Sequence, residues 1–196
     1  ALRLEMAIEA LEDFSHPVAD ACDRTPLDGI SIEGWDRLHE TLEMLSQREA
    51  PITAVGIDLS VHGDDQADAH GDIEPFLETN YYTDAAYAFS AAHRADVLAG
   101  YSGSASAWQG CFVEIDNTIS VTGMGMLNAE LRQLEAAIRA GSNESDLDHD
   151  AYWIGSAFLA VRLHQAVRNM IIEWGLPTPL TVLVGSNEAY PFFDAP

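Results

Sequence analysis

A stretch of histidines and carboxylates between residues 62 and 74 is the part of the chain best suited to chemistry. Imidazole nitrogens and carboxylate oxygens are good ligands for divalent metals. The spacing does not match a calcium-binding loop, which needs alternating acids, a central glycine and a terminal glutamate. We therefore interpret the stretch first as a solvated acidic loop, second as an edge that attracts a cationic partner, and third as a metal site. Its members are His62, Asp64, Asp65, Asp68, His70, Asp72 and Glu74, and the metal candidates among them are His62, His70, Asp68 and Asp72.

The segment from Gly100 to Ser104 resembles the strand-to-helix turn that exposes a nucleophilic serine in many hydrolases. That motif places a glycine two residues before the serine and another two residues after it. Here the second glycine, Gly103, directly follows Ser102. We therefore expect a loop of small residues and assign no catalytic residue.

Three aspartates, Asp146, Asp148 and Asp150, begin like a calcium loop. Alanines stand where that loop requires its glycine and its terminal glutamate, so the match fails. Serine and aspartate also accept hydrogen bonds from the free N–H groups of a helix start, and their charge suits its positive end. We predict that Ser145 and these aspartates cap the helix that follows.

The negative net charge of the chain limits the kinds of molecule that it could bind. The chain of 196 residues contains no lysine, and nine arginines face 32 acidic residues, which gives a formal net charge of −23. Nucleic acids and anionic membranes attract clustered positive charge, so both are excluded as expected partners. No stretch is long and apolar enough to span a membrane. Genome composition or a high-salt cytoplasm could also produce such general acidity.

The hydrophobic pattern predicts one α+β domain over residues 1–196, in which helices pack against a meandering antiparallel sheet in two layers. Residues 1–48 are expected to be helical, 51–123 mainly antiparallel strands, 124–174 two helices and 180–185 a final strand. The last helix, Ala151 to Trp174, is apolar on most faces, so we expect it to be long and mostly buried. Two alternating runs around Asp116 and Asn117 predict a tight hairpin.

These observations favour a binding protein over an enzyme. Complementary charge would let an acidic domain find and neutralise a basic protein partner, as an inhibitor or immunity-type protein does. The region between Glu49 and His93 holds nine acids and no arginine, and is the first surface to consider. We expect no cofactor and a cytoplasmic location. The predicted binding residues are Asp64, Asp65, Asp68, Asp72, Glu74 and Glu78.

Two alternatives of other classes remain open. One is a small enzyme or metal-dependent protein that uses the loop 62–74. The other is an oligomeric structural subunit, with general acidic adaptation, whose long apolar helix packs across a homodimer. The binding hypothesis predicts acids gathered on one face with aromatic anchors among them.

Overall fold

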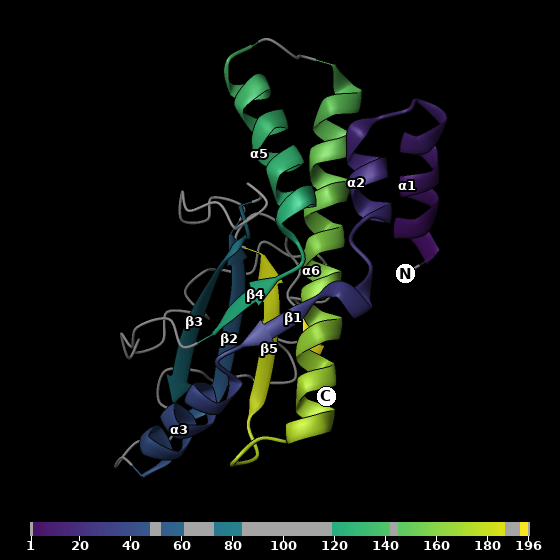
Figure 1. The fold of residues 1–196 in the computed structure, drawn as a ribbon. Coiled ribbons are helices and arrows are strands. Elements are labelled where there is room, and N and C mark those ends of the chain that lie inside the picture. Colours follow the sequence, from purple (N-terminus) through teal and green to yellow (C-terminus); the bar gives the residue numbers. More distant parts are fainter. Residues whose placement is uncertain are drawn as a thin grey trace.

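The computed structural model describes residues 2–47, 52–60, 73–83, 119–141, 145–186 and 193–195. Within these residues helices pack against β-sheet, which confirms the predicted α+β class. Figure 1 shows α5 (Gly125–Arg139) and α6 (Asp146–Trp174) side by side at one end of the molecule. The sheet lies at the other end, beside the second half of α6.

Two helices open the described chain, α1 (Leu2–Asp13) and α2 (Pro17–Asp23). The apolar stripe of α1 is buried at Ile8 and Leu11. Pro17 occupies the first turn of α2, where its missing N–H would have no helical partner in any case. Helix α2 contacts α1, α5 and α6, and α1 contacts α2 and α6. In Figure 1 α2 is drawn between α1 and the pair formed by α5 and α6.

The remaining helices follow the predicted stripes. Helix α3 (Trp35–Ser46) buries Trp35, Leu38, Leu42 and Leu45, and α5 buries Leu127, Leu131 and Leu134. Gly141 follows α5 with a φ of 65°, the left-handed conformation that ends many helices. The predicted long helix is confirmed as α6, and its middle turns are buried. No helix in the described part of the chain is long and apolar enough to cross a membrane.

A glycine allows α6 to approach α5 and α2 closely. A methyl group at Gly155 would lie 2.6 Å from Cδ2 of Leu131 and 3.0 Å from Cγ1 of Val18. Carbon atoms that are not bonded to one another pack at about 3.5–4.0 Å. Gly155 therefore fixes how tightly the helical end of the molecule packs.

The main sheet has four strands in the order β3-β2-β5-β6. Strands β2 (Ile52–Ser60) and β3 (Phe76–Thr83) form an antiparallel hairpin, as predicted. Strand β5 (Thr181–Ser186) runs parallel to β2, and β6 (Phe193–Ala195) pairs antiparallel with β5. The sheet is thus mixed, because the chain passes through α5 and α6 before it returns to β2, and a parallel pair requires such a long connection.

The two faces of this sheet differ in composition. One face carries the core residues Val55, Ile57, Leu59, Leu77, Tyr81, Val182 and Val184. The other face carries Gly56 and Asp58 of β2, Asn80 of β3 and Leu183 of β5, and these are buried as well. A carboxylate therefore lies in the interior strand of the sheet among buried neighbours.

A second, two-stranded sheet pairs β1 (Ser31–Glu33) with β4 (Ser120–Thr122). Ile32 and Val121 lie opposite one another and are both buried. Directly after β4, Gly123 adopts a φ of 90° and lies against the backbone of Gly29. The predicted hairpin at Asp116 and Asn117 lies outside the described residues.

Candidate functional site

Most of the residues predicted to bind a partner or a metal lie outside the described part of the chain. These residues are His62, Asp64, Asp65, Asp68, His70 and Asp72. The segment around Ser102 also lies outside it. Of the predicted set, the structure places Glu74 and Glu78, which lie before and within β3.

Glu74 caps the start of α5 from 50 residues away in the sequence. Its Oε1 accepts a hydrogen bond of 2.7 Å from the N–H of Gly123, and its Oε2 accepts one of 2.9 Å from the N–H of Met124. Beside it, the side chain of Asn128 donates to the carbonyl oxygen of Ile73 at 2.7 Å. A carboxylate is favourable at this position because the N-terminal end of a helix carries partial positive charge. Glu74 therefore holds the chain before β3 against α5.

Glu78 is exposed on β3 and lies directly opposite Asp58 of β2. The Asp58 side chain is only 7% exposed. Its Oδ2 accepts a hydrogen bond of 3.1 Å from Nδ2 of Asn80, whereas its Oδ1 is buried and has no hydrogen-bond partner in the part of the chain that the structure describes. Two carboxylates thus face the same side of the sheet on neighbouring strands. One of them, Asp58, is buried with a hydrogen bond from the described residues to only one of its two oxygens.

Burial raises the pKa of Asp58 from 3.8 to about 6. The negative charge of Glu78 raises this pKa further, and the hydrogen bond from Asn80 opposes both effects. Buried charge without full compensation is costly, so such a group in a strand is unusual in a purely structural role. The sequence analysis did not select Asp58. The one charged residue within the strand-like run Ile52 to Leu59 was the available signal.

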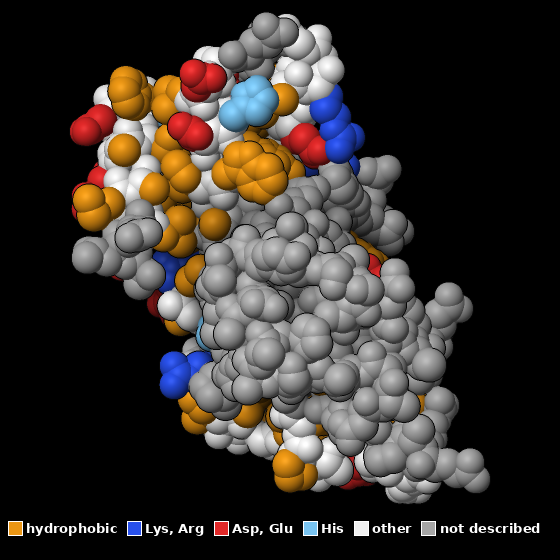
Figure 2. All heavy atoms as spheres, turned by 180° about the vertical axis from the view of Figure 1, so that it is seen from behind, with side chains coloured by type: hydrophobic (Ala, Val, Ile, Leu, Met, Phe, Trp, Pro, Cys, Tyr) orange, Lys and Arg blue, Asp and Glu red, His pale blue; other side chains and the backbone are white. Residues whose placement is uncertain are grey.

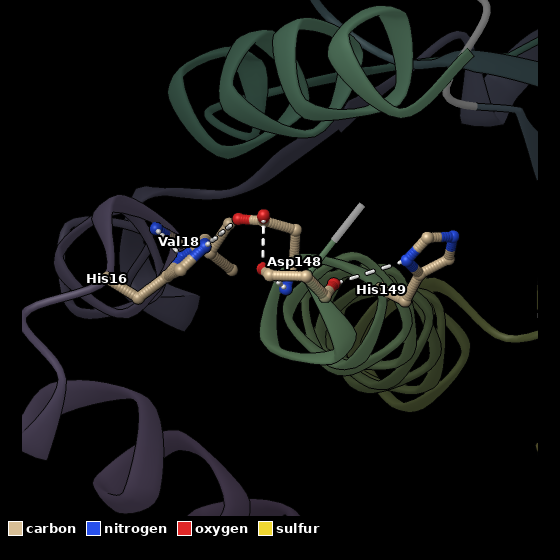
Figure 3. A network of polar contacts seen from close by, with 5 residues as sticks. His16, Val18, Asp148 and His149 are labelled. Carbon is tan, nitrogen blue, oxygen red and sulfur yellow. Dashed lines mark hydrogen bonds and ion pairs between the residues drawn. The ribbon is translucent and has the colours of Figure 1, made fainter. Parts of the chain in front are cut away.

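A polar network joins α2 to α6 (Figure 3). The Nδ1 atom of His16 accepts from the N–H of Val18 at 3.2 Å, so His16 caps α2 and its Nε2 carries the proton. That Nε2 donates to Oδ1 of Asp148 at 3.4 Å. The Ser145 hydroxyl donates to Oδ2 of Asp148, and this hydrogen bond is the main cause that lowers the pKa of Asp148.

The network contains serine, histidine and aspartate, but their order does not suit catalysis. A nucleophilic serine must donate to a histidine that is free to take its proton. Here Ser145 donates to Asp148, and both ring nitrogens of His16 are already used. Ser145 also accepts from the N–H of Asp148 at 3.1 Å, which confirms its predicted role as the cap of α6. The network therefore fastens α2 to the start of α6.

Clusters of three or more histidine, cysteine, aspartate or glutamate side chains that could hold a metal ion do not occur within the described residues. The loop 62–74 is outside this search except for its last two residues. The metal-dependent alternative that uses this loop stays a prediction.

The clearest candidate surface lies at the helical end of the molecule, on α1 and the first turns of α6. Three large apolar side chains are exposed there: Met6 at 61%, Phe14 at 69% and Trp153 at 53%. Exposed acids accompany them at Glu5, Glu9, Glu12, Asp13, Asp146 and Asp150. We call these nine residues the helical-end surface. Seen from behind, hydrophobic side chains gather in the upper part of the molecule with acidic ones among them (Figure 2).

The residues that form this surface lie in two acidic ranges of the chain, one between Arg3 and Arg24 and the other between Arg139 and Arg162. Residues 4–23 contain six acids, and residues 140–161 contain four, without an arginine in either range. The His16–Asp148 contact holds the end of α1 close to the start of α6, because His16 follows α1 by only three residues. Acids on both helices therefore add to one local negative field.

Several arginines elsewhere in the described chain are engaged locally. Arg24 pairs with Asp20 and Arg139 pairs with Glu135, each one helical turn apart. Arg162 lies over the Phe158 ring, 4.6 Å from its centroid, and donates to Gln165. These partners of the three arginines lie outside the helical-end surface.

The sequence analysis expected acids with aromatic anchors but looked for them between Glu49 and His93. The sequence did not indicate the helical-end surface, because Trp153 belongs to a helix that is apolar on most faces and that we expected to be mostly buried. The available signal was a tryptophan that follows Asp146 and Asp150 within two helical turns.

Comparisons with models of protein families, with curated proteins and with solved structures find no match for this chain.

Proposed function

We propose that this protein is an acidic binding module that neutralises a basic protein partner, and that the helical-end surface is its contact site. The observation that carries the proposal is the exposure of Met6, Phe14 and Trp153 among carboxylates, in the acidic ranges 4–23 and 140–161. Exposed aromatic side chains next to acids provide both parts of an interface with a cationic protein: apolar anchors and a charged rim.

The two parts of the surface would contribute differently to binding. Burial of Trp153 and Phe14 against a partner would supply most of the affinity, because interface energy is concentrated in a few desolvated aromatic residues. The surrounding carboxylates would accelerate encounter with a positive surface and would repel other acidic proteins. A partner with an apolar patch bordered by arginine or lysine fits this arrangement.

The rigidity of the surface also supports this function. Interfaces bind more tightly when their residues are ordered before the partner arrives. The His16–Asp148 contact fastens the start of α2, three residues after the end of α1, to the first turn of α6. Helix α6 also approaches α5 and α2 closely at Gly155. Met6 and Trp153 are thus displayed on helices, and Phe14 follows directly after the end of α1.

Charge neutralisation tests the proposal with a defined probe. The probe is a basic amphipathic peptide with a leucine face and an arginine face, titrated by isothermal calorimetry. In the double variant Glu9→Gln/Asp150→Asn we expect the dissociation constant to rise about fivefold, because each rim charge contributes about 0.5 kcal/mol. Binding should also depend less steeply on salt concentration, since screening then acts on fewer charges.

A matched variant provides the control. Glu43→Gln/Glu173→Gln removes the same number of exposed acids from α3 and from the other end of α6. We expect it to bind the peptide with nearly the affinity of the unmodified protein. Equal weakening in both double variants would show that only net charge matters and would contradict a specific helical-end surface.

A further inference from the structure

A second feature lies on the four-stranded sheet, away from the helical-end surface. Asp58 of β2 and Glu78 of β3 are directly paired across the antiparallel hairpin, and Asn80 lies on the same face of β3 because it is two residues further along. Like charges that face one another on neighbouring strands destabilise a sheet. Three oxygen-bearing side chains are thus concentrated on one small area of the sheet.

The Asp58 carboxylate lacks a partner for one of its oxygens. The side chain is more than nine-tenths buried and its Oδ2 accepts from Asn80, whereas its Oδ1 has no hydrogen-bond partner among the described residues. Buried polar atoms in proteins are almost always satisfied, so each exception calls for a ligand, an ion or a functional reason. The exception here lies next to a second carboxylate.

The strand neighbours of Asp58 on this face include two glycines. On β2 its neighbour on the same face towards the N-terminus is Gly56, and on β5 the residue directly opposite is Gly185. Neither glycine has a side chain that could donate a hydrogen bond to Asp58. Glu78, on the third side, is exposed and connects the buried carboxylate with solvent.

We propose that Asp58, Glu78 and Asn80 form a binding site for a hard divalent cation of the Ca²⁺ or Mg²⁺ type. Both ions prefer carboxylate and amide oxygens, and Mg²⁺ commonly keeps several of its waters while one or two carboxylates hold it. A bound cation would satisfy the buried Asp58 oxygen and remove the repulsion between Asp58 and Glu78. The site differs from the loop 62–74 and does not depend on the proposed binding function.

Thermal unfolding with CaCl₂ or MgCl₂ tests this site. The protein is first treated with a chelator, and each salt is then titrated at constant ionic strength. We expect the midpoint of unfolding to rise with cation concentration, because a ligand that binds only the folded state stabilises it. Asp58→Asn should lose the cation-dependent rise, and Glu78→Gln should shift it to concentrations about tenfold higher or more.

Glu33→Gln provides the matched control, since Glu33 is an exposed acid on a strand of the other sheet. This variant should keep the full cation response. Calorimetric titration of each variant with the same salts separates binding from changes in intrinsic stability. The proposal is overturned if the unmodified protein shows no cation-dependent rise, or if Asp58→Asn retains it, because the cation would then bind elsewhere.

Discussion

Replacing Asp58 by asparagine is expected to raise the free energy of unfolding at neutral pH by about 1–3 kcal/mol in the presence of a chelator. A difference of one in pKa between the folded and unfolded states corresponds to 1.36 kcal/mol. The rise in the pKa of Asp58 from 3.8 to about 6 therefore corresponds to about 3 kcal/mol as an upper limit. Asparagine keeps an oxygen that can accept from Asn80, but its new N–H groups need partners, which reduces the gain.

The pH dependence of this effect has a defined sign. The folded state binds the Asp58 proton more tightly than the unfolded state, so the stabilising contribution is fully present below about pH 4. It is lost as the pH rises through about 6. The difference in stability between Asp58→Asn and the unmodified protein should consequently be largest above pH 6 and small below pH 4.

Urea denaturation at a series of pH values measures this difference directly. Asp36→Asn is a suitable control because Asp36 is an exposed acid in the first turn of α3. This variant should be no more stable than the unmodified protein at neutral pH, because a carboxylate in the first turn of a helix is favourable. A lower stability of Asp58→Asn at neutral pH, or a difference that does not vary with pH, would contradict the assignment of Asp58 as a buried, poorly compensated carboxylate.

Gly123→Ala is expected to lower the free energy of unfolding by about 3 kcal/mol or more. Gly123 has a φ of 90°, which an L-residue adopts only with strain of about 1–3 kcal/mol. A methyl group there would also overlap the carbonyl oxygen of Gly29 and lie 2.9 Å from its carbonyl carbon. Both atoms belong to the backbone, so the chain at Gly123 would have to move away from Gly29. This movement would weaken the hydrogen bonds that Glu74 accepts from the N–H groups of Gly123 and Met124.

Two other glycine variants separate the effect of backbone strain from the effect of the steric contact with Gly29. Gly29→Ala places its methyl group 3.6 Å from Pro26, an ordinary contact, and should cost less than 1 kcal/mol. Gly175→Ala shares the positive φ but meets no atom within 4 Å, so it should show the backbone strain alone. Thermal unfolding of the three variants gives the comparison. A loss in Gly123→Ala no larger than in Gly175→Ala would argue against the close contact with Gly29.

The helices could be predicted well because their signals are local. The leucines of α5 and α3 recur at helical spacing, and Ser145 and Gly141 lie at positions where caps are common. The hairpin of β2 and β3 could also be anticipated, since two strand-like runs follow one another in sequence. These features depend on residues only a few positions apart.

The parallel pairing of β2 with β5 and the small β1–β4 sheet could not be predicted in this way. They join segments that are separated by about a hundred residues, and no local pattern records such contacts. The role of Glu74 could not be predicted either, because its carboxylate caps a helix 50 residues away. Nor could the pairing of Asp58 with Glu78, which depends on the register of two strands.

The helical-end surface could not be predicted from the sequence. The acidic region between Glu49 and His93 stays a prediction as a contact site, because most of it lies outside the described residues. Sequence periodicity cannot tell which apolar residue at the edge of a stripe is covered by a neighbouring helix. Trp153 is half exposed although Tyr152 and Ile154 on either side of it pack against the core.

The proposed binding function depends above all on Trp153, and α6 itself offers the control. Trp174 is 64% exposed at the other end of the same helix, outside the helical-end surface. Titration of the basic amphipathic peptide into Trp153→Ala and Trp174→Ala compares two tryptophans of similar exposure on one helix. We expect Trp153→Ala to weaken binding by at least about 2 kcal/mol, or roughly thirtyfold, as for interface hot spots, and Trp174→Ala to leave it nearly unchanged. Equal affinities of the two variants would contradict the assignment of the helical-end surface as the contact site.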